Sequence, residues 1–304
     1  MAPVAEQRTG ASVDRRAVLT AFSTGRYDPT CRIGMHQGWF AINTPNGPAT
    51  LTMCWDNDGA LDAEAFGPGR QWALDHASAM AGDHDTTATS FVPPPGPVAD
   101  WHRRSPGLRI GRTSRVFDAL VPVVLAQRVT SGEAVRSWSG LVRAFGAPAP
   151  RSNAPFALKC PPTAEALAKA PYYAFHRFGV DRGRAETIRF AAKRVDRLEE
   201  AATFEREQAY ARLHAFPGIG VWTSALTLGM AIGDADAVAV GDFHLKNIVG
   251  WNLAGEARAT DERMVELLEP YRGHRARVVA LLGRHGDGAP KFGPRQRVLP
   301  IAQM

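Results

Sequence analysis

The spacing of apolar residues separates a strand-like N-terminal region from a longer region with helical periodicity. Between Cys31 and Cys54, apolar and polar residues alternate in RIGMHQGWFAIN and in PATLTMCW, and TPNGP has the composition of a turn. Residues 61–66 have the pattern of a further short strand, and Gln71–Met80 that of a helix. Residues 1–20 show no period and are expected to be loose. The pattern therefore predicts a small antiparallel β-sheet near the N-terminus.

Helical periodicity dominates after the Pro-rich segment SFVPPPGPVADW, so we expect a boundary near residue 100. Thr113 or Ser114 can cap a helix through RVFDALVPVVLAQRV, in which Pro122 favours a kink or a shifted start. A second helix, SGEAVRSWSGLVRAFG, should end at Gly146. Further helices are expected in TAEALAKA, GRAETIRFAAKRVDRLEEA and EREQAYARLHAF, over about 221–232, from about Asp242, and in TDERMVELLEPYRGHRARVVALLG.

These patterns predict an α+β fold in which a small N-terminal antiparallel β-sheet domain precedes an all-α core. We expect a flexible N-terminus over 1–25, the sheet domain over 26–100 and the helical domain over 101–285. Residues 286–304 form a basic C-terminal tail with Lys291, Arg295 and Arg297.

The composition is that of an ordinary globular protein, with 45% apolar and 22% charged residues in 304. No stretch approaches the ~20 apolar residues of a membrane helix, and the first residues lack the apolar segment of a secretory signal. We therefore expect a cytoplasmic protein without a membrane partner. Cys31, Cys54 and Cys160 are too few and too far apart for a disulfide framework or a thiolate metal site.

Positive charge is concentrated in the second part of the chain. Residues 1–104 carry 8 Lys and Arg against 11 Asp and Glu, a balance of −3, and the remaining residues have a balance of +9. A polyanion would therefore bind the second part. The alternative, an arginine-rich surface without a function, stays open.

The segment FPGIGVWTSALTLG places a Pro-Gly-x-Gly turn between two helical patterns. Gly218 and Gly220 permit a tight turn and the close approach of another molecule. The first amides of the following helix lack partners within the helix and carry partial positive charge, which suits a DNA phosphate. The alternative is a plain helix–helix turn.

A single acidic residue, Asp242, follows Gly220 by 22 residues in the apolar run AVAVGDFHL. It is a candidate catalytic carboxylate, and the alternative role is a helix N-cap worth about 1 kcal/mol. Asp234 and Asp236 in the loop-like GDAD are expected to be solvated.

With these motifs, segment 113–283 resembles the helix–hairpin–helix base-excision DNA glycosylases, most closely the DNA-3-methyladenine glycosylase II type. FPGIGVWTSA is similar to the hairpin of that family, LAQRVTSGEA to its helix with Gln and a wedge residue, and GVDRGRAETI to its Gly-x-x-x-(Lys/Arg)-Arg-Ala segment. GDFHLKN matches the family aspartate, and the β-rich first hundred residues suit the N-terminal sheet domain. The resemblance implies an all-α helix–hairpin–helix glycosylase core.

The resemblance also implies a function and a site. The enzyme would flip a damaged, alkylated purine out of double-stranded DNA and hydrolyse its N-glycosidic bond, with Asp242 stabilising the cationic sugar. Arg128 stands at the wedge position beside Gln127, and Trp222 and Leu226 line the base pocket, Leu226 where close relatives have Tyr. The residues expected to bind the DNA backbone are Pro217, Gly218, Ile219, Gly220 and Thr223.

Two departures from related enzymes shape the expected chemistry. Trp222 occupies the position of the Schiff-base lysine of lyases, which implies a monofunctional enzyme that leaves an intact abasic site. No Cys lies beyond Cys160, so no iron–sulfur cluster is expected. No cofactor is required, although the main-chain carbonyls of His214, Phe216 and Ile219 match a family site for a monovalent cation. We expect a monomer associated with the nucleoid.

Three other functions stay open at this point. The chain could be a damage-binding protein without catalysis, or a glycosylase for another base such as hypoxanthine or an oxidised purine. It could also be a metabolic enzyme in which the Pro-Gly turn is incidental, and such an enzyme would show no salt-dependent affinity for DNA.

Overall fold

The computed structural model describes residues 12–290, and every structural statement below refers to these residues. The first part of the expected flexible N-terminus and the tail residues Lys291, Arg295 and Arg297 lie outside this range. The strands are β1 (Cys31–Ile33), β2 (Gln37–Thr44), β3 (Gly47–Trp55) and β4 (Leu61–Phe66). The helices are α1 (Arg15–Thr20), α2 (Arg70–Met80), α3 (Pro97–Arg104), α4 (Val116–Leu125), α5 (Ser131–Phe145), α6 (Ala164–Lys169), α7 (Arg182–Ala192), α8 (Val195–Glu199), α9 (Arg206–His214), α10 (Val221–Ala231), α11 (Leu245–Ala254), α12 (Asp261–Leu268) and α13 (Arg275–His285).

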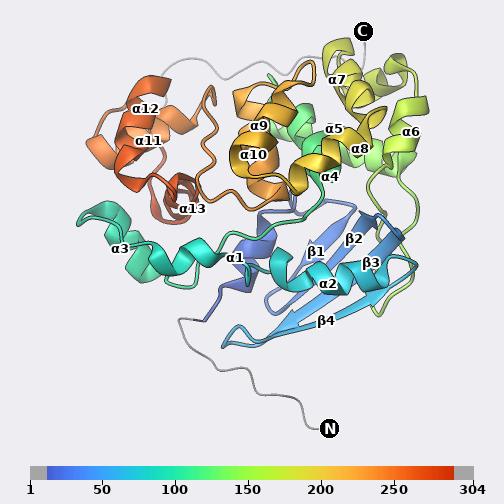
Figure 1. The fold of residues 1–304 in the computed structure, drawn as a ribbon, viewed down its shortest axis with the longest axis horizontal. Helices are drawn as coiled ribbons and strands as arrows, with labels where there is room; N and C mark the ends of the chain where they lie inside the picture. The colour runs from blue at the N-terminus through green and yellow to red at the C-terminus, as the bar shows by residue number, and fades with distance from the viewer. Residues whose placement is uncertain (1–11, 291–304) are drawn as a thin grey trace.

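The four strands form one antiparallel sheet in the order β1-β2-β3-β4. The β2–β3 hairpin at TPNGP and the strand over 61–66 are confirmed. The single strand expected over 32–43 is two strands, because the chain turns back where the Gly34 N–H donates to the Gln37 carbonyl at 2.7 Å. The α+β fold class is therefore confirmed, with the sheet at the N-terminal end (Figure 1).

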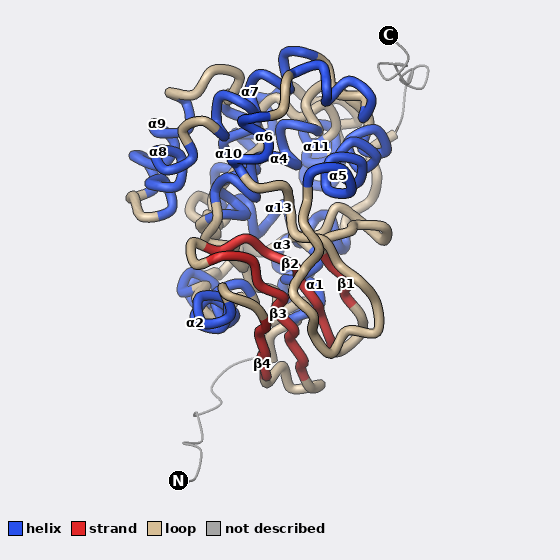
Figure 2. Tube along the Cα trace, turned by 90° about the vertical axis from the view of Figure 1, so that its right-hand side faces the viewer, coloured by secondary structure: helices blue, strands red, loops and turns tan. Residues whose placement is uncertain are grey.

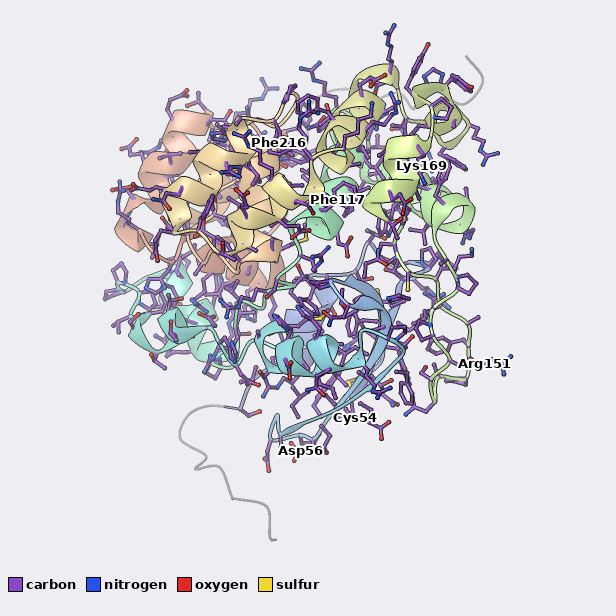
Figure 3. All side chains as sticks on the ribbon, turned by 45° about the vertical axis from the view of Figure 1, so that its right-hand side comes forward. Cys54, Asp56, Phe117, Arg151, Lys169 and Phe216 are labelled. Atoms are coloured by element: carbon purple, nitrogen blue, oxygen red, sulfur yellow. The ribbon has the colours of Figure 1, made fainter. Side chains whose placement is uncertain are left out.

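The two faces of the sheet are covered by different structures, as Figure 2 shows. Alternate residues Phe40, Leu51 and Met53 pack against Ala73 and Ala77 of α2. The opposite face lies under the loop over 147–161, which the sheet holds by hydrogen bonds. Thr50 Oγ1 donates to the Pro150 carbonyl at 2.7 Å, and Asn43 Nδ2 donates to the Pro161 carbonyl at 3.0 Å. Figure 3 places Arg151 in this loop beside the sheet.

The helices enclose two separate apolar cores. The larger core is formed by α4 to α10 and includes Phe117, Leu141 and Ile188. A second core joins α11, α12 and α13 to α3, through Trp101, Val249 and Leu281 among others. In Figure 1, α11–α13 lie beside α3 and apart from the sheet. The chain between α10 and α11 therefore connects two packed units.

Several elements differ from the sequence expectation. The expected loose start contains α1, capped by the Asp14 carboxylate, and the Pro-rich segment contains α3, which begins at a proline. The helix expected over 183–201 is divided into α7 and α8 by a turn at Lys193 and Arg194. The last expected helix is divided into α12 and α13 by a turn that contains Gly273 with φ +87°.

The N-terminus of α4 is not capped by Thr113 or Ser114, so that expectation is wrong. The Glu199 carboxylate instead accepts hydrogen bonds from the N–H groups of Val116 at 2.9 Å and Phe117 at 3.0 Å. Ser114 is held in the left-handed region at φ +55°, with its N–H donated to the Ala231 carbonyl. The cap therefore comes from α8, more than 80 residues away in the chain.

None of the helices within residues 12–290 is long and apolar enough to cross a membrane.

Candidate active site at the helical hairpin

The hairpin over residues 215–220 connects α9 to α10 and packs on α7. Gly218 has φ +82°, and a Cβ at this position would lie 2.0 Å from Thr187 Oγ1. Ile219 is buried, whereas Pro217, Gly218 and Gly220 are exposed. Only glycine satisfies both the backbone conformation and the contact with α7 at position 218. The Ile219 side chain therefore faces the interior of the protein, and the rest of the turn faces solvent.

The start of α10 is open to an approaching molecule. No side chain caps this helix, and its first backbone hydrogen bond runs from the Ser224 N–H to the Gly220 carbonyl. A Cβ added to Gly220 would meet no atom within 4 Å. The N–H groups of the first turn are therefore available to an anion, and the helix dipole adds positive potential there.

Gln127 ties the end of α4 to the hairpin. Its Nε2 donates to the Gly218 carbonyl at 3.0 Å and to Thr223 Oγ1 at 2.9 Å. Thr223 is buried in the first turn of α10. Gln127, Gly218 and Thr223, which the resemblance to the family singled out, are thus in direct contact. Gln127 links the end of α4 to the hairpin and to the first turn of α10.

The three carbonyl groups matched to a cation site belong to residues that brace the same turn. His214 Nε2 hydrogen-bonds with Ser224 Oγ at 2.9 Å, which links the end of α9 to α10. The Phe216 carbonyl accepts one hydrogen bond, from the Ile219 N–H at 3.2 Å, and keeps a second lone pair. The His214 ring is therefore engaged with a serine.

Asp242 lies against the first turn of α10. Trp222 Nε1 donates to its Oδ2 at 3.0 Å, and the N–H groups of His244 and Leu245 donate to its Oδ1 at 2.8 and 2.9 Å. The carboxylate thus caps the start of α11 while one oxygen faces Trp222. The two roles considered for this residue, helix cap and active carboxylate, are compatible in the same geometry.

Arg128 lies in a turn after α4 rather than in a helix, and its side chain is exposed. Its φ of +58° is in the left-handed region, which costs a non-glycine residue of order 1 kcal/mol or more. Buried Arg184 holds this turn in place, because its Nη1 donates to the Leu125 carbonyl at 2.8 Å and its Nη2 to the Gly179 carbonyl at 2.8 Å. Arg128 therefore projects from a turn that Arg184 holds in place.

Exposed apolar side chains gather near the contact between Trp222 and Asp242. Leu226, one helical turn after Trp222, is 36% exposed, and Phe243, next to Asp242, is 75% exposed. Phe243 lies edge-on to the exposed ring of His244, with the ring centroids 4.9 Å apart. Phe243 was not among the residues expected from the sequence, although an aromatic residue directly after the candidate carboxylate is a visible signal.

Asp234 and Asp236 are buried rather than solvated, so that expectation is wrong. Asp234 accepts hydrogen bonds from Tyr210 Oη at 2.8 Å and Arg206 Nε at 3.0 Å. Asp236 pairs with Arg275 at the start of α13. Burial raises the pKa of Asp236, but the hydrogen bonds and charge of Arg275 outweigh it and hold the pKa below its usual value. These carboxylates connect α9 and α13 and are not available for chemistry.

The three cysteines lie apart as free thiols, with Cys31 and Cys160 buried. Within the described part of the chain, no group of three or more His, Cys, Asp or Glu side chains is arranged to hold a metal ion.

Comparison with solved structures identifies the fold. A 3-methyladenine DNA glycosylase from Archaeoglobus fulgidus matches with a TM-score of 0.74 and 20% identity, over 90% of this chain and 94% of that one. An 8-oxoguanine glycosylase/lyase from Clostridium acetobutylicum, bound to DNA, matches with a TM-score of 0.55 and 12% identity, over 81% and 87%. A 3-methyladenine DNA glycosylase from Schizosaccharomyces pombe, bound to abasic DNA, matches with a TM-score of 0.51 and 18% identity, over 65% and 95%. No family model and no curated protein matches the sequence.

Proposed function

We propose that this chain, which has the fold of the helix–hairpin–helix DNA glycosylases, removes a damaged base from duplex DNA by hydrolysing its N-glycosidic bond. The observation that carries the proposal is the hydrogen bond from Trp222 to Asp242. Trp222 belongs to the helical turn whose free amides can bind a phosphate. A DNA strand held by those amides would therefore present an extruded nucleotide next to the carboxylate.

The chemistry assigned to Asp242 is electrostatic stabilisation. Breaking an N-glycosidic bond builds positive charge on the sugar, and a fixed carboxylate beside it lowers the barrier. The donors from Trp222, His244 and Leu245 hold the Asp242 carboxylate in one orientation before DNA binds. The same carboxylate can orient the attacking water.

The hairpin binds the DNA backbone. Pro217, Gly218 and Gly220 present an exposed backbone, and the amides of α10 bind phosphate without reading sequence. Arg128 acts as the wedge, since its strained turn projects a planar guanidinium that can stack in the gap left by the extruded base. A monovalent cation held by the carbonyls of His214, Phe216 and Ile219 would add positive charge at the phosphate.

The surface around Trp222, where the extruded base would bind, is apolar. Trp222 offers an aromatic face, and Leu226 and Phe243 add exposed apolar surface around it. An electron-poor alkylated purine suits an aromatic face through a cation–π contact. We therefore place alkylated purines first among the substrates, ahead of hypoxanthine and oxidised purines.

Trp222 also determines the product. It stands where a lyase would carry a lysine, and an indole cannot form a Schiff base with the sugar. The enzyme should therefore release the base and leave the DNA strand intact.

The first prediction concerns Asp242. A panel of duplexes, each with one modified base, is incubated with the full-length protein, and base release is scored with and without alkali. Asp242→Asn should lower excision by at least about 100-fold, because the charge next to the sugar is lost. Binding to duplex DNA should change less than twofold, and strand breaks should require alkali.

Exposed Asp100 provides the matched control, since its Asn variant makes the same chemical change at the surface. Circular dichroism of Asp242→Asn checks that the variant keeps the helix content of the unmodified protein. An unchanged excision rate, or lesion binding without base release by the unmodified protein, would contradict the catalytic assignment. If the affinity for DNA does not fall steeply as the salt concentration rises, phosphate binding is contradicted. That result would favour a metabolic enzyme in which the Pro-Gly turn does not bind DNA.

A further inference from the structure

Three exposed arginines lie around the turn that Arg184 holds in place. Arg128 lies in that turn, Arg177 in the short 3₁₀ helix η2 (Tyr172–Phe178), and Arg182 in the first turn of α7. The buried guanidinium of Arg184 joins these segments, because it donates to one carbonyl just before the Arg128 turn and to another just after η2. The three segments therefore meet at one place on the surface.

The positive charge at this place is not neutralised by the protein. The guanidinium groups of Arg128, Arg177 and Arg182 form no ion pair with any residue from 12 to 290. Arg189, on the same helix as Arg182, instead pairs with Glu186 at 2.9 Å. Exposed guanidinium groups without carboxylate partners attract a polyanion, and duplex DNA carries one negative charge per ~1.7 Å of its axis.

Arg182 is also positioned by an aromatic ring. Its Cζ lies 4.9 Å from the ring centroid of Tyr172. The Tyr172 ring packs edge-on against His176 and Tyr173, with centroids 5.5 and 5.9 Å away. A ring under a guanidinium fixes its plane and leaves the N–H groups at its edge free, which suits the oxygens of a phosphate. Arg182 is therefore ordered before a ligand arrives.

The surface around Arg182 adjoins the hairpin through α7. Thr187, five residues after Arg182, is the residue against which Gly218 packs. At about 1.5 Å per residue, Arg182 lies about 7.5 Å from this contact along the helix axis. A DNA strand rises about 3.4 Å per nucleotide, so this separation corresponds to roughly two nucleotides. Arg182 is therefore within the footprint of a duplex bound at the hairpin.

We propose that Arg182 binds a backbone phosphate of duplex DNA at a contact separate from the amides of α10, and that Tyr172 positions its guanidinium. The inference rests on the proposed function only in that duplex DNA is the partner. Arg128 and Arg177 add positive charge around this contact. Because a phosphate carries no sequence information, the contact strengthens binding to damaged and undamaged duplex by the same factor.

Fluorescence anisotropy of the full-length protein on a labelled duplex tests the proposal, with and without one abasic-site analogue in the duplex. Affinity is measured between about 50 and 200 mM NaCl. Arg182→Gln should weaken binding to both duplexes about tenfold, because a charged hydrogen bond is lost. It should also lower the slope of log affinity against log salt by about one, the change expected for one phosphate contact.

Arg26→Gln is the matched control. Exposed Arg26 lies over the ring of Tyr27 at 5.7 Å in the sheet domain, so the variant loses the same charge and the same kind of ring contact. Its affinity should change less than about twofold, because salt screens a charge that does not touch DNA. Tyr172→Phe keeps a ring under Arg182 and should bind as the unmodified protein does, whereas Tyr172→Leu should bind more weakly.

A second experiment locates the phosphate. Duplexes with one neutral methylphosphonate linkage, placed at successive positions of either strand, are bound by the unmodified protein and by Arg182→Gln. At the position that Arg182 contacts, the neutral linkage should weaken binding of the unmodified protein about tenfold and that of the variant less than about twofold. The strand that contains this position is the one that Arg182 binds.

An unchanged salt slope in Arg182→Gln would overturn the proposal, and so would an equal loss of affinity in Arg26→Gln, which would reflect net charge alone. The proposal also fails if every neutral linkage weakens both proteins by the same factor. Base release does not enter these measurements. A lowered slope without base release would overturn only the proposed catalysis, base release with an unchanged slope would overturn only the Arg182 contact, and absence of duplex binding would overturn both.

Discussion

At the scale of single residues, the hairpin depends on the absence of a side chain at position 218. A methyl group there would occupy the space of Thr187 Oγ1, and the left-handed φ would add backbone strain. Gly220 has neither constraint, because its φ is −101° and its surroundings are open. The two glycines therefore differ: Gly218 is required for packing, and Gly220 leaves open the surface at which the proposed function places DNA.

This difference leads to a paired prediction. Gly218→Ala should lower the free energy of unfolding by about 1–3 kcal/mol, as measured by urea denaturation. Gly220→Ala should lower it by no more than about 1 kcal/mol, yet weaken binding to duplex DNA because the methyl group stands over the free amides. Equal stability losses in both variants would argue against the division of roles.

At the scale of elements, α4 connects two regions that are distant in sequence. Its N-terminus is held by Glu199 of α8, and its C-terminus leads to Gln127 and Arg128 at the hairpin. Figure 1 shows α4 beside α10, with the sheet below. Figure 3 shows Phe117, near the start of α4, closer to the sheet than Phe216 at the hairpin. The placement of this helix therefore sets the position of Arg128, the residue proposed as the wedge.

The cap of α4 by Glu199 should contribute measurably to the stability of the protein. Glu199→Ala removes two charge-assisted hydrogen bonds and the ion pair with Arg115, which should cost about 3 kcal/mol. Ser114→Ala, at the residue expected from the sequence to cap, should change the free energy of unfolding by less than about 0.5 kcal/mol. A large loss in Ser114→Ala would contradict the assignment of the cap to Glu199.

At the scale of the whole molecule, a buried ion pair joins the segment before α3 to α13. Arg277 Nη2 donates to Asp85 Oδ1 at 2.9 Å, and both side chains are almost fully buried. Burial raises the pKa of Asp85, but the hydrogen bond and charge of Arg277 outweigh it, and the pKa lies below its usual value. Because the folded-state pKa is lowered, this contribution to stability is present above about pH 4 and is lost as pH falls further.

Acid unfolding tests this connection. Asp85→Asn should lower the free energy of unfolding at pH 7 by about 3–5 kcal/mol, because Arg277 is left buried without its partner. Below pH 4 the difference between variant and unmodified protein should shrink, because Asp85 is protonated first in the unfolded state and then, as pH falls through its lowered folded-state pKa, in the folded state as well. A difference that stays constant from pH 7 to pH 2.5 would show that the ion pair does not stabilise this part of the fold.

The local features of the molecule follow from the order of its residues. Alternation of apolar residues identified β3 and β4, periodicity with Gly146 identified α5 and its end, and the glycines at 218 and 220 identified the hairpin. These features depend on interactions between residues a few positions apart, so the order of residue types is sufficient to predict them.

Contacts between distant groups depend on the folded chain as a whole. Folding brings Trp222 to Asp242, Gln127 to Gly218 and Glu199 to the start of α4, across 20, 91 and 82 or 83 residues. It also buries Asp234 and Asp236 in ion pairs, where loop composition had indicated solvent. Such contacts depend on how helices pack around shared apolar cores, and packing is a property of the assembled chain that no local window contains.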